Sequence, residues 1–261
     1  DYDGDRFLMG EVSGVDGKAM LVSQTFTEPG RLHATYNFDL LEHGGLTVSE
    51  MKEAISNAIE LFNGTGKLSF AFSNHDVPRS ASRQLSPLGI TLDKQDDLQF
   101  LLLQLETSLI GSCCIYQGEE LGLSDVTNIQ FDKMKDPWGL NFYPEFLGRD
   151  TCRTPMVWEK NKPMGGFTSA NESWLPISEL HMEKAGLDMA NSEGSIYNKF
   201  SSFLKWRRKQ PAMISSNKMS ELFGGPSEII FDRESETQIL RCKFDFELVK
   251  ATFEEVTYGT S

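Results

Sequence analysis

Apolar and polar positions alternate along the first half of the chain in blocks that predict strands and helices in turn. The apolar runs are short and rich in β-branched or aromatic residues, which is typical of buried strands, whereas the stretches between them repeat with the period of a helix. This alternation predicts a parallel sheet with a site at the carboxyl ends of its strands. The predicted strands cover residues 7–12, 32–38, 68–70 and 112–116, and the predicted helices cover residues 49–62, with Ser49 as cap, and 95–110.

The second half of the chain has a different texture. Residues 121–193 are rich in Pro, Gly and Trp and predict a long irregular loop, a kind of segment that is usually functional. Residues 196–209 return to a helical period, which Pro211 ends. From residue 224 onward, short alternating runs predict a small antiparallel domain. The expected division is therefore 1–223 and 224–261.

Composition narrows the class of protein. The formal net charge of −13 argues against nucleic acid and against an anionic membrane as partners, because the field of the protein repels phosphates. No apolar run approaches the about 20 residues needed to span a bilayer, and the N-terminus does not resemble a signal peptide. Cys113 and Cys114 are expected to be buried free thiols, which favours a reducing, cytoplasmic compartment.

Polar side chains follow the predicted strands at three places. Glu11 ends the first strand among apolar neighbours, which would raise its pKa and let it donate a proton; the alternative is a solvated Glu that begins a loop. His75 and Asp76 follow the third strand, where they can hold sugar hydroxyls or stabilise positive charge, while Asn74 or Asp76 could simply cap a helix. Glu119 and Glu120 at the next strand end favour a structural role, as adjacent acids usually do.

Two arginines lie within the long loop. Arg149 and Arg153 stand among aromatic residues, where they could clamp a ligand or pin the loop to the rest of the protein. The residues alone leave both roles open.

Five motifs stand out along the chain. They are Met-Gly-Glu-Val at 9–12, Ser-Asn-His-Asp-Val-Pro-Arg at 73–79, Ile-Tyr-Gln-Gly-Glu-Glu-Leu-Gly at 115–122, Asp-Pro-Trp-Gly at 136–139 and Gly-Arg-Asp-Thr-Cys-Arg-Thr-Pro-Met at 148–156. The same motifs occur in this order in the α-amylase superfamily, and the chain resembles its α-glucosidase and oligo-1,6-glucosidase branch from about residue 5 to residue 245.

The resemblance implies a retaining glycosidase, in which two carboxyl groups stand about 5–5.5 Å apart as nucleophile and acid/base. Matched by motif, Glu11 is the general acid/base and Asp76 is the carboxylate that stabilises the transition state. His75 and Arg149 bind the same sugar, and Arg153 is a structural anchor. The resemblance further implies an α/β fold: strands five to eight of a TIM (β/α)8 barrel, followed by the start of a small antiparallel β domain. It implies no cofactor and no metal.

The sequence departs from the family in one respect. The family nucleophile is an Asp in an Arg-x-Asp pattern on the strand before the acid/base, and the ten residues ahead of Glu11 contain no such pattern. We therefore expect a fragment that does not hydrolyse α-glucosides alone. Four parallel strands cannot close a barrel, so we expect open sheet edges and an association with the missing half or with a second copy.

The resemblance leaves three functions open. The first is an α-glucosidase that acts on small α-gluco-oligosaccharides, disaccharides or sucrose-like sugars. The second is a glucosyl-transferring or isomerising relative, such as a sucrose isomerase or trehalose synthase. The third, from another class, is the non-catalytic amylase-like domain of a transporter heavy chain. The joint presence of Glu11, His75 and Asp76 favours an enzyme.

Overall fold

Four short parallel strands, each linked to the next through helix, form the first part of the protein. The computed structural model describes residues 3–12, 19–62, 67–216 and 218–257, and the sheet order within them follows the chain, β1-β2-β3-β4. The predicted strand–helix alternation is confirmed. The elements are β1 (Met9–Gly10), α1 (Ala19–Phe26), β2 (Ala34–Tyr36), α2 (Val48–Phe62), β3 (Leu68–Phe70), α3 (Ser80–Arg83), α4 (Gln95–Ser108) and β4 (Ser112–Cys113).

Helix α2 begins at Val48, one residue earlier than the sequence predicts. Thr47, not Ser49, caps it: the Glu50 backbone N–H donates to Thr47 Oγ1 (3.3 Å), and the Thr47 N–H donates to Glu50 Oε2 (2.8 Å). This reciprocal capping box satisfies two backbone donors that the first turn of a helix leaves unpaired. The apolar face of α2 then turns toward the core along its length.

The two outer strands are less buried than the sequence predicts. Phe7 is 65% and Met9 is 45% exposed in and before β1. Cys113 in β4 is also exposed and Cys114 is half-buried, so the expectation of two buried thiols in a buried strand is wrong. The reason is the position of the strands: among the described residues, β1 and β4 each pair with one neighbour and stand at the edges of the sheet.

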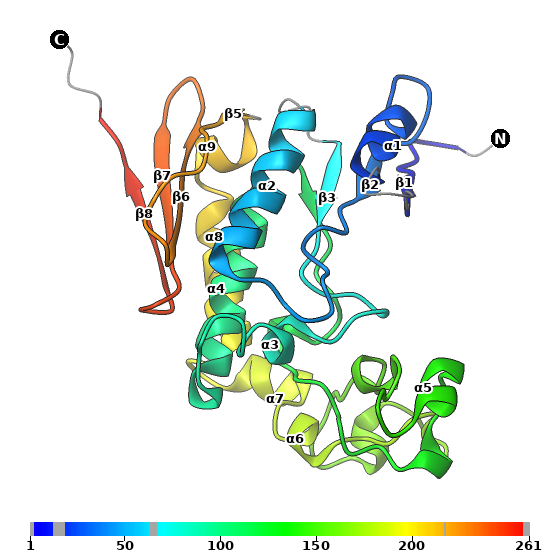
Figure 1. Ribbon diagram of the computed structural model, residues 1–261. Coiled ribbons are helices and arrows are strands. Elements are labelled where there is room, and N and C mark those ends of the chain that lie inside the picture. The colour runs from blue at the N-terminus through cyan, green and yellow to red at the C-terminus, as the bar shows by residue number, and fades with distance from the viewer. Residues whose placement is uncertain (1–2, 13–18, 63–66, 217, 258–261) are drawn as a thin grey trace.

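A second, antiparallel sheet covers the outer side of the helices. Figure 1 shows α2, α4 and α8 standing between the two sheets, with the strands of the antiparallel sheet at the left. Its order is β5-β6-β7-β8, and because β5 pairs with β6, the sheet begins ahead of residue 224, where the sequence places the change. The elements of this part are α8 (Ile196–Arg207), α9 (Pro211–Ile214), β5 (Lys218–Met219), β6 (Glu228–Glu234), β7 (Ile239–Asp245) and β8 (Lys250–Glu255).

One continuous apolar cluster joins the three layers. It runs from Phe70 on β3 through Ile55 on α2 and Leu102 on α4 to Phe231 and Phe244 on the antiparallel sheet, and all five side chains are buried. Both faces of the helix layer are thus apolar, because each face meets a sheet.

A buried arginine ties the antiparallel sheet to the helix layer. Arg233 on β6 is 2% exposed, and its guanidinium donates to the carbonyl oxygens of Ser108 (2.7 Å), Leu109 (2.9 Å) and Ser216 (2.7 Å). Ser108 is the last residue of α4, so the cation satisfies carbonyls that the end of the helix leaves unpaired.

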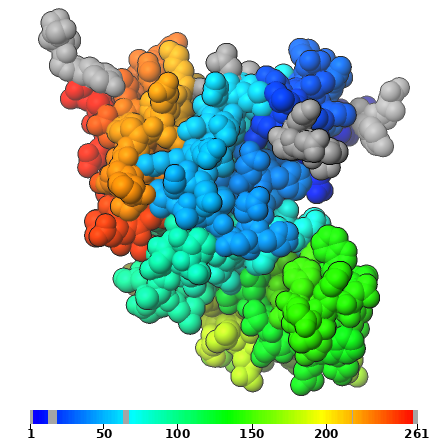
Figure 2. Space-filling model, viewed as in Figure 1, coloured from blue at the N-terminus to red at the C-terminus, as the bar shows by residue number. Residues whose placement is uncertain are grey.

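Residues 121–193 form a lobe that contains short helices and, within the described residues, no strand, which confirms the predicted irregular segment. Figure 1 shows this lobe at the lower right, below the carboxyl ends of the parallel strands, and the space-filling view in Figure 2 shows it packed against the rest of the protein. Its α-helices are α5 (Pro137–Phe142), α6 (Glu179–Met182) and α7 (Gly186–Asn191).

No helix in the ranges that the structure describes combines the length and the apolar character needed to cross a membrane.

Candidate functional site

In the turn after β3, His75 is exposed and Asp76 is half-buried. Asn74 Oδ1 accepts the backbone N–H groups of Asp76 (2.8 Å) and Val77 (3.1 Å). This side-chain turn reverses the chain directly after the buried strand. Because α3 begins only at Ser80, Asn74 closes a turn and does not cap a helix.

Two arginines from the lobe converge on the Asp76 carboxylate. Oδ1 accepts from Arg149 Nη1 (3.1 Å) and from Arg153 Nη2 (2.7 Å), and His75 Nε2 lies 3.5 Å from Oδ2. Arg153 Nε also donates to the carbonyl of His75 (2.6 Å). The structure therefore brings together three predicted site residues, His75, Asp76 and Arg149, and adds a fourth.

Arg153 is the residue that sequence reasoning placed outside the site. It does anchor the lobe, as predicted, but it does so through the carboxylate of Asp76 itself. The spacing contained the signal: Asp150–Cys152 forms one 3₁₀ turn, so residues 149 and 153 flank a single turn and can project on the same side.

Asp136 holds Arg149 from the opposite side. Asp136 Oδ2 accepts from Arg149 Nε (3.0 Å), and Oδ1 accepts from Nη2 (2.8 Å), which is a bidentate pair. The Arg149 guanidinium lowers the pKa of Asp136 to about 2, and in turn the pKa of Arg149 is raised. Trp138 adds its ring, whose centroid lies 4.9 Å from Arg149 Cζ. Asp136 begins the Asp-Pro-Trp-Gly motif, from which the sequence predicts no role for its side chain.

Glu11 lies apart from this cluster in its contacts. It follows β1 directly and its side chain is exposed, so the apolar surroundings that the sequence predicts for it are not present. Among the described residues, no hydrogen bond or ion pair joins Glu11 to Asp76. The strand order still places both at the same edge: β1 is two strands from β3, about 10 Å at the usual spacing.

Glu119 and Glu120 serve the scaffold under the site. Glu119 is buried and accepts from Ser73 Oγ (2.6 Å), Ser80 Oγ (2.8 Å) and the Tyr116 N–H (2.8 Å). It thereby ties the turn after β3 to the end of β4. This agrees with the structural role that the sequence predicts for the two adjacent acids. Burial also raises the pKa of Glu120.

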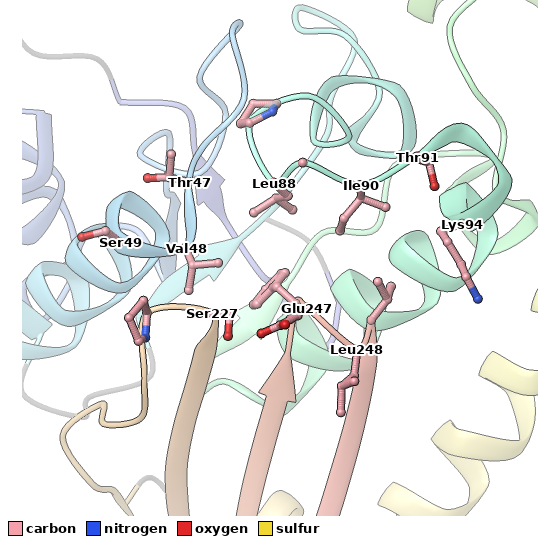
Figure 3. Close-up of a pocket in the computed structure, with 15 residues that line it drawn as sticks. Thr47, Val48, Ser49, Leu88, Ile90, Thr91, Lys94, Ser227, Glu247 and Leu248 are labelled. Atoms are coloured by element: carbon pink, nitrogen blue, oxygen red, sulfur yellow. The ribbon is translucent and has the colours of Figure 1, made fainter.

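A cavity of about 580 Å³ lies elsewhere, between α2, the loop that precedes α4 and the hairpin that joins β7 to β8. Figure 3 shows Val48, Leu88, Ile90 and Leu248 around it, with Lys94 at one end. Its lining includes none of the predicted site residues.

A parallel sheet with a carboxylate, a histidine and arginines at the carboxyl ends of its strands has the arrangement of a barrel-enzyme active site. The family model for the α-amylase catalytic domain matches residues 2–216, and the chain belongs to this family.

Two curated relatives show where in the family the chain falls. It is 38% identical over 206 residues to the "Probable alpha-glucosidase" of Rhizobium meliloti, which covers 78% of this chain and 36% of the relative. It is 27% identical over 227 residues to the oligo-1,6-glucosidase of Parageobacillus thermoglucosidasius, at 75% and 39% coverage. The chain thus spans less than half the length of these relatives.

Solved structures agree with the fold. The α-glucosyl transfer enzyme XgtA matches with a TM-score of 0.78 at 31% identity, over 91% of this chain and 42% of the enzyme. The trehalose-6-phosphate hydrolase of Bacillus licheniformis matches with a TM-score of 0.76 at 20% identity, over 92% and 47%, and supports the fold alone.

Proposed function

We propose that this chain forms the second half of the (β/α)8 barrel of a retaining α-glucosidase, with the start of its antiparallel domain. In this assignment β1 to β4 are barrel strands five to eight, and the second domain begins with β5, ahead of the boundary at residue 224 that the sequence predicts. Support comes from the parallel order of the strands, from the family match and from coverage of 42% of XgtA.

The observation that carries the proposal is the Asp76 cluster at the carboxyl end of β3. A carboxylate that two guanidinium groups orient can hold hydroxyl groups of a distorted sugar, and it offers negative charge to an oxocarbenium-like transition state. His75, exposed beside it, has ring nitrogens that can bond the same sugar. Glu11, accessible at the end of β1, is the general acid/base that protonates the leaving oxygen and later activates water.

The covalent step needs a carboxylate nucleophile, which attacks the anomeric carbon as the leaving oxygen departs. The sequence ahead of Glu11 holds no Arg-x-Asp pattern to supply it. We therefore propose that the 261-residue chain alone binds but does not hydrolyse α-glucosides. The substrates in the complete enzyme would be small α-gluco-oligosaccharides or disaccharides, as the names of the glucosidase relatives suggest.

Glucosyl transfer is the second candidate. The likeness to XgtA, named an α-glucosyl transfer enzyme, favours it at 31% identity. Hydrolysis and transfer share the glucosyl-enzyme and differ in whether water or a sugar hydroxyl attacks it, which depends on how well the site excludes water. The trehalulose and isomaltulose synthases match at 18–21% identity and bear on the fold alone.

A chimera tests the proposal. Residues of this chain replace the matching 206-residue segment of the Rhizobium meliloti relative, and p-nitrophenol release from p-nitrophenyl α-glucoside is measured. We expect hydrolysis that Glu11→Gln and Asp76→Asn each reduce by about a thousandfold or more. Glu60→Gln, an exposed acid on α2, is the matched control and should leave the rate unchanged.

The controls define what would contradict the proposal. The unaltered relative gives the reference rate, and circular dichroism with a thermal melt shows whether the chimera folds. A folded chimera that is inactive, or one whose rate Glu11→Gln leaves intact, would overturn the assignment. Incubation with maltose then separates the two candidates: glucose alone indicates hydrolysis, whereas trisaccharide indicates transfer.

A further inference from the structure

The segment 134–150 closes around the side chain of Asp136. That side chain has no exposed surface, and each carboxylate oxygen accepts two hydrogen bonds. Oδ2 accepts from Arg149 N (2.7 Å) and Nε (3.0 Å), while Oδ1 accepts from Arg149 Nη2 (2.8 Å) and from the Trp138 N–H (3.4 Å). Three of the four donors belong to Arg149.

This arrangement removes the freedom of a long side chain. The fork between Asp136 and Arg149 fixes the plane and the direction of the guanidinium, because two parallel bonds allow one orientation. The Trp138 ring covers one face of the group at 4.9 Å. The third guanidinium nitrogen of Arg149, Nη1, is not bound by Asp136 and lies 3.1 Å from Asp76 Oδ1.

The surrounding backbone is built to hold the carboxylate. Asp150 Oδ2 accepts the backbone N–H groups of Lys135 (2.5 Å) and Asp136 (2.9 Å), which fixes where Asp136 begins. Gly148 has a positive φ of 68°, and a Cβ there would lie 2.6 Å from Asp136 Oδ2. Only glycine fits both the conformation and this close approach.

We propose that Asp136 is the positioning residue that fixes the Arg149 guanidinium so that Nη1 faces Asp76. Its further claim, that this orientation serves sugar binding, rests on the proposed function. Arg153 is held differently, since its Nε donates to the His75 carbonyl, and it therefore provides an internal control.

The first experiment observes the Asp136–Arg149 pair directly in the 261-residue chain. The Arg149 Nε–H signal is assigned by its loss in Arg149→Lys, and its exchange with water is measured by ¹⁵N NMR. We expect Asp136→Asn to speed this exchange about tenfold or more, the loss of one charge-assisted bond, and to leave the Arg153 Nε–H unchanged. Fast exchange of the Arg149 Nε–H in the unaltered chain would overturn the proposal, and this reading does not require Asp136→Asn to fold.

The second experiment measures the consequence for binding with a glucose-configured iminosugar, titrated into the same chain. Asp136→Asn should weaken binding about tenfold, yet less than twofold in an Arg149→Lys background, since it acts through Arg149. In an Arg153→Lys background the full loss should persist. Equal losses in both backgrounds indicate a merely structural Asp136 and overturn the proposal. Absence of binding by the unaltered chain contradicts the sugar site, whereas the exchange measurement still decides the positioning.

Discussion

Removal of the Arg233 guanidinium should destabilise the junction between the antiparallel sheet and the helix layer. The change is Arg233→Met, which keeps most of the side-chain volume and deletes three hydrogen bonds to the Ser108, Leu109 and Ser216 carbonyls. Bonds from a charged donor contribute about 1.5–3 kcal/mol each, so the gross loss is about 6 kcal/mol.

A buried charge offsets part of this loss. Burial lowers the pKa of Arg233 to about 10, which corresponds to about 3 kcal/mol against the charged form. Methionine is free of that cost. The net expected decrease in the free energy of unfolding is therefore about 3 kcal/mol.

Urea unfolding, followed by tryptophan fluorescence and circular dichroism, measures the change. Arg241→Met is the matched control. Arg241 lies on the adjacent strand β7, its side chain is 40% exposed and it forms a bidentate pair with Asp232 (2.9 Å for both bonds), so its loss should cost less than the loss of Arg233. If Arg233→Met shifts the free energy of unfolding by no more than Arg241→Met does, the three bonds do not hold the junction and the reasoning is refuted.

Two further predictions concern other buried groups. Burial lowers the pKa of His181 from 6.5 to about 4, so between these pH values the unfolded chain takes up a proton that the folded chain does not. The free energy of unfolding should therefore fall by about 3 kcal/mol as the pH drops from above 6.5 toward 4. His181→Gln should flatten this dependence in urea midpoints measured at pH 7 and 4.5. Glu119→Gln should lower the free energy of unfolding by about 2 kcal/mol, because both carboxylate oxygens accept hydrogen bonds and one of them becomes a donor that faces a donor. Glu120→Gln should cost less, because the amide oxygen can still accept the Gly118 N–H. Equal melts for Glu119→Gln and the unaltered chain would contradict this.

The periodicity of the sequence predicts the elements well and their surroundings poorly. Apolar spacing in α2 and α4 and alternation in β6 and β7 reflect faces that pack against neighbours, so these elements follow from the residues. The burial of β1 and β4 cannot be predicted in this way, because it depends on how many strands pair with each of them, and the residues of a strand do not reveal that number. Cys113 shows this: its apolar context predicts burial, and its edge position leaves it exposed.

The candidate site divides in the same way. The order of motifs along the chain predicts that His75, Asp76 and Arg149 share one site, and the structure places Arg149 3.1 Å from Asp76. The parts contributed by Asp136 and Arg153 depend on how a loop without regular structure closes. Such closure comes from individual side-chain bonds and close approaches at glycine, which leave no period in the sequence.

The apolar cluster shared by both sheets limits how this protein can be recombined. Ile55 and Leu102 belong to one cluster with residues of both sheets, and α2 contacts β6 while α4 contacts β7 and β8. The residues of both helices are therefore matched to the antiparallel sheet as well as to the parallel one. An exchange of the antiparallel domain with that of a relative, cut near residue 217, would bring a foreign surface against both helices. Such domain swaps should succeed only when the outward-facing residues of α2 and α4 travel with the sheet that covers them.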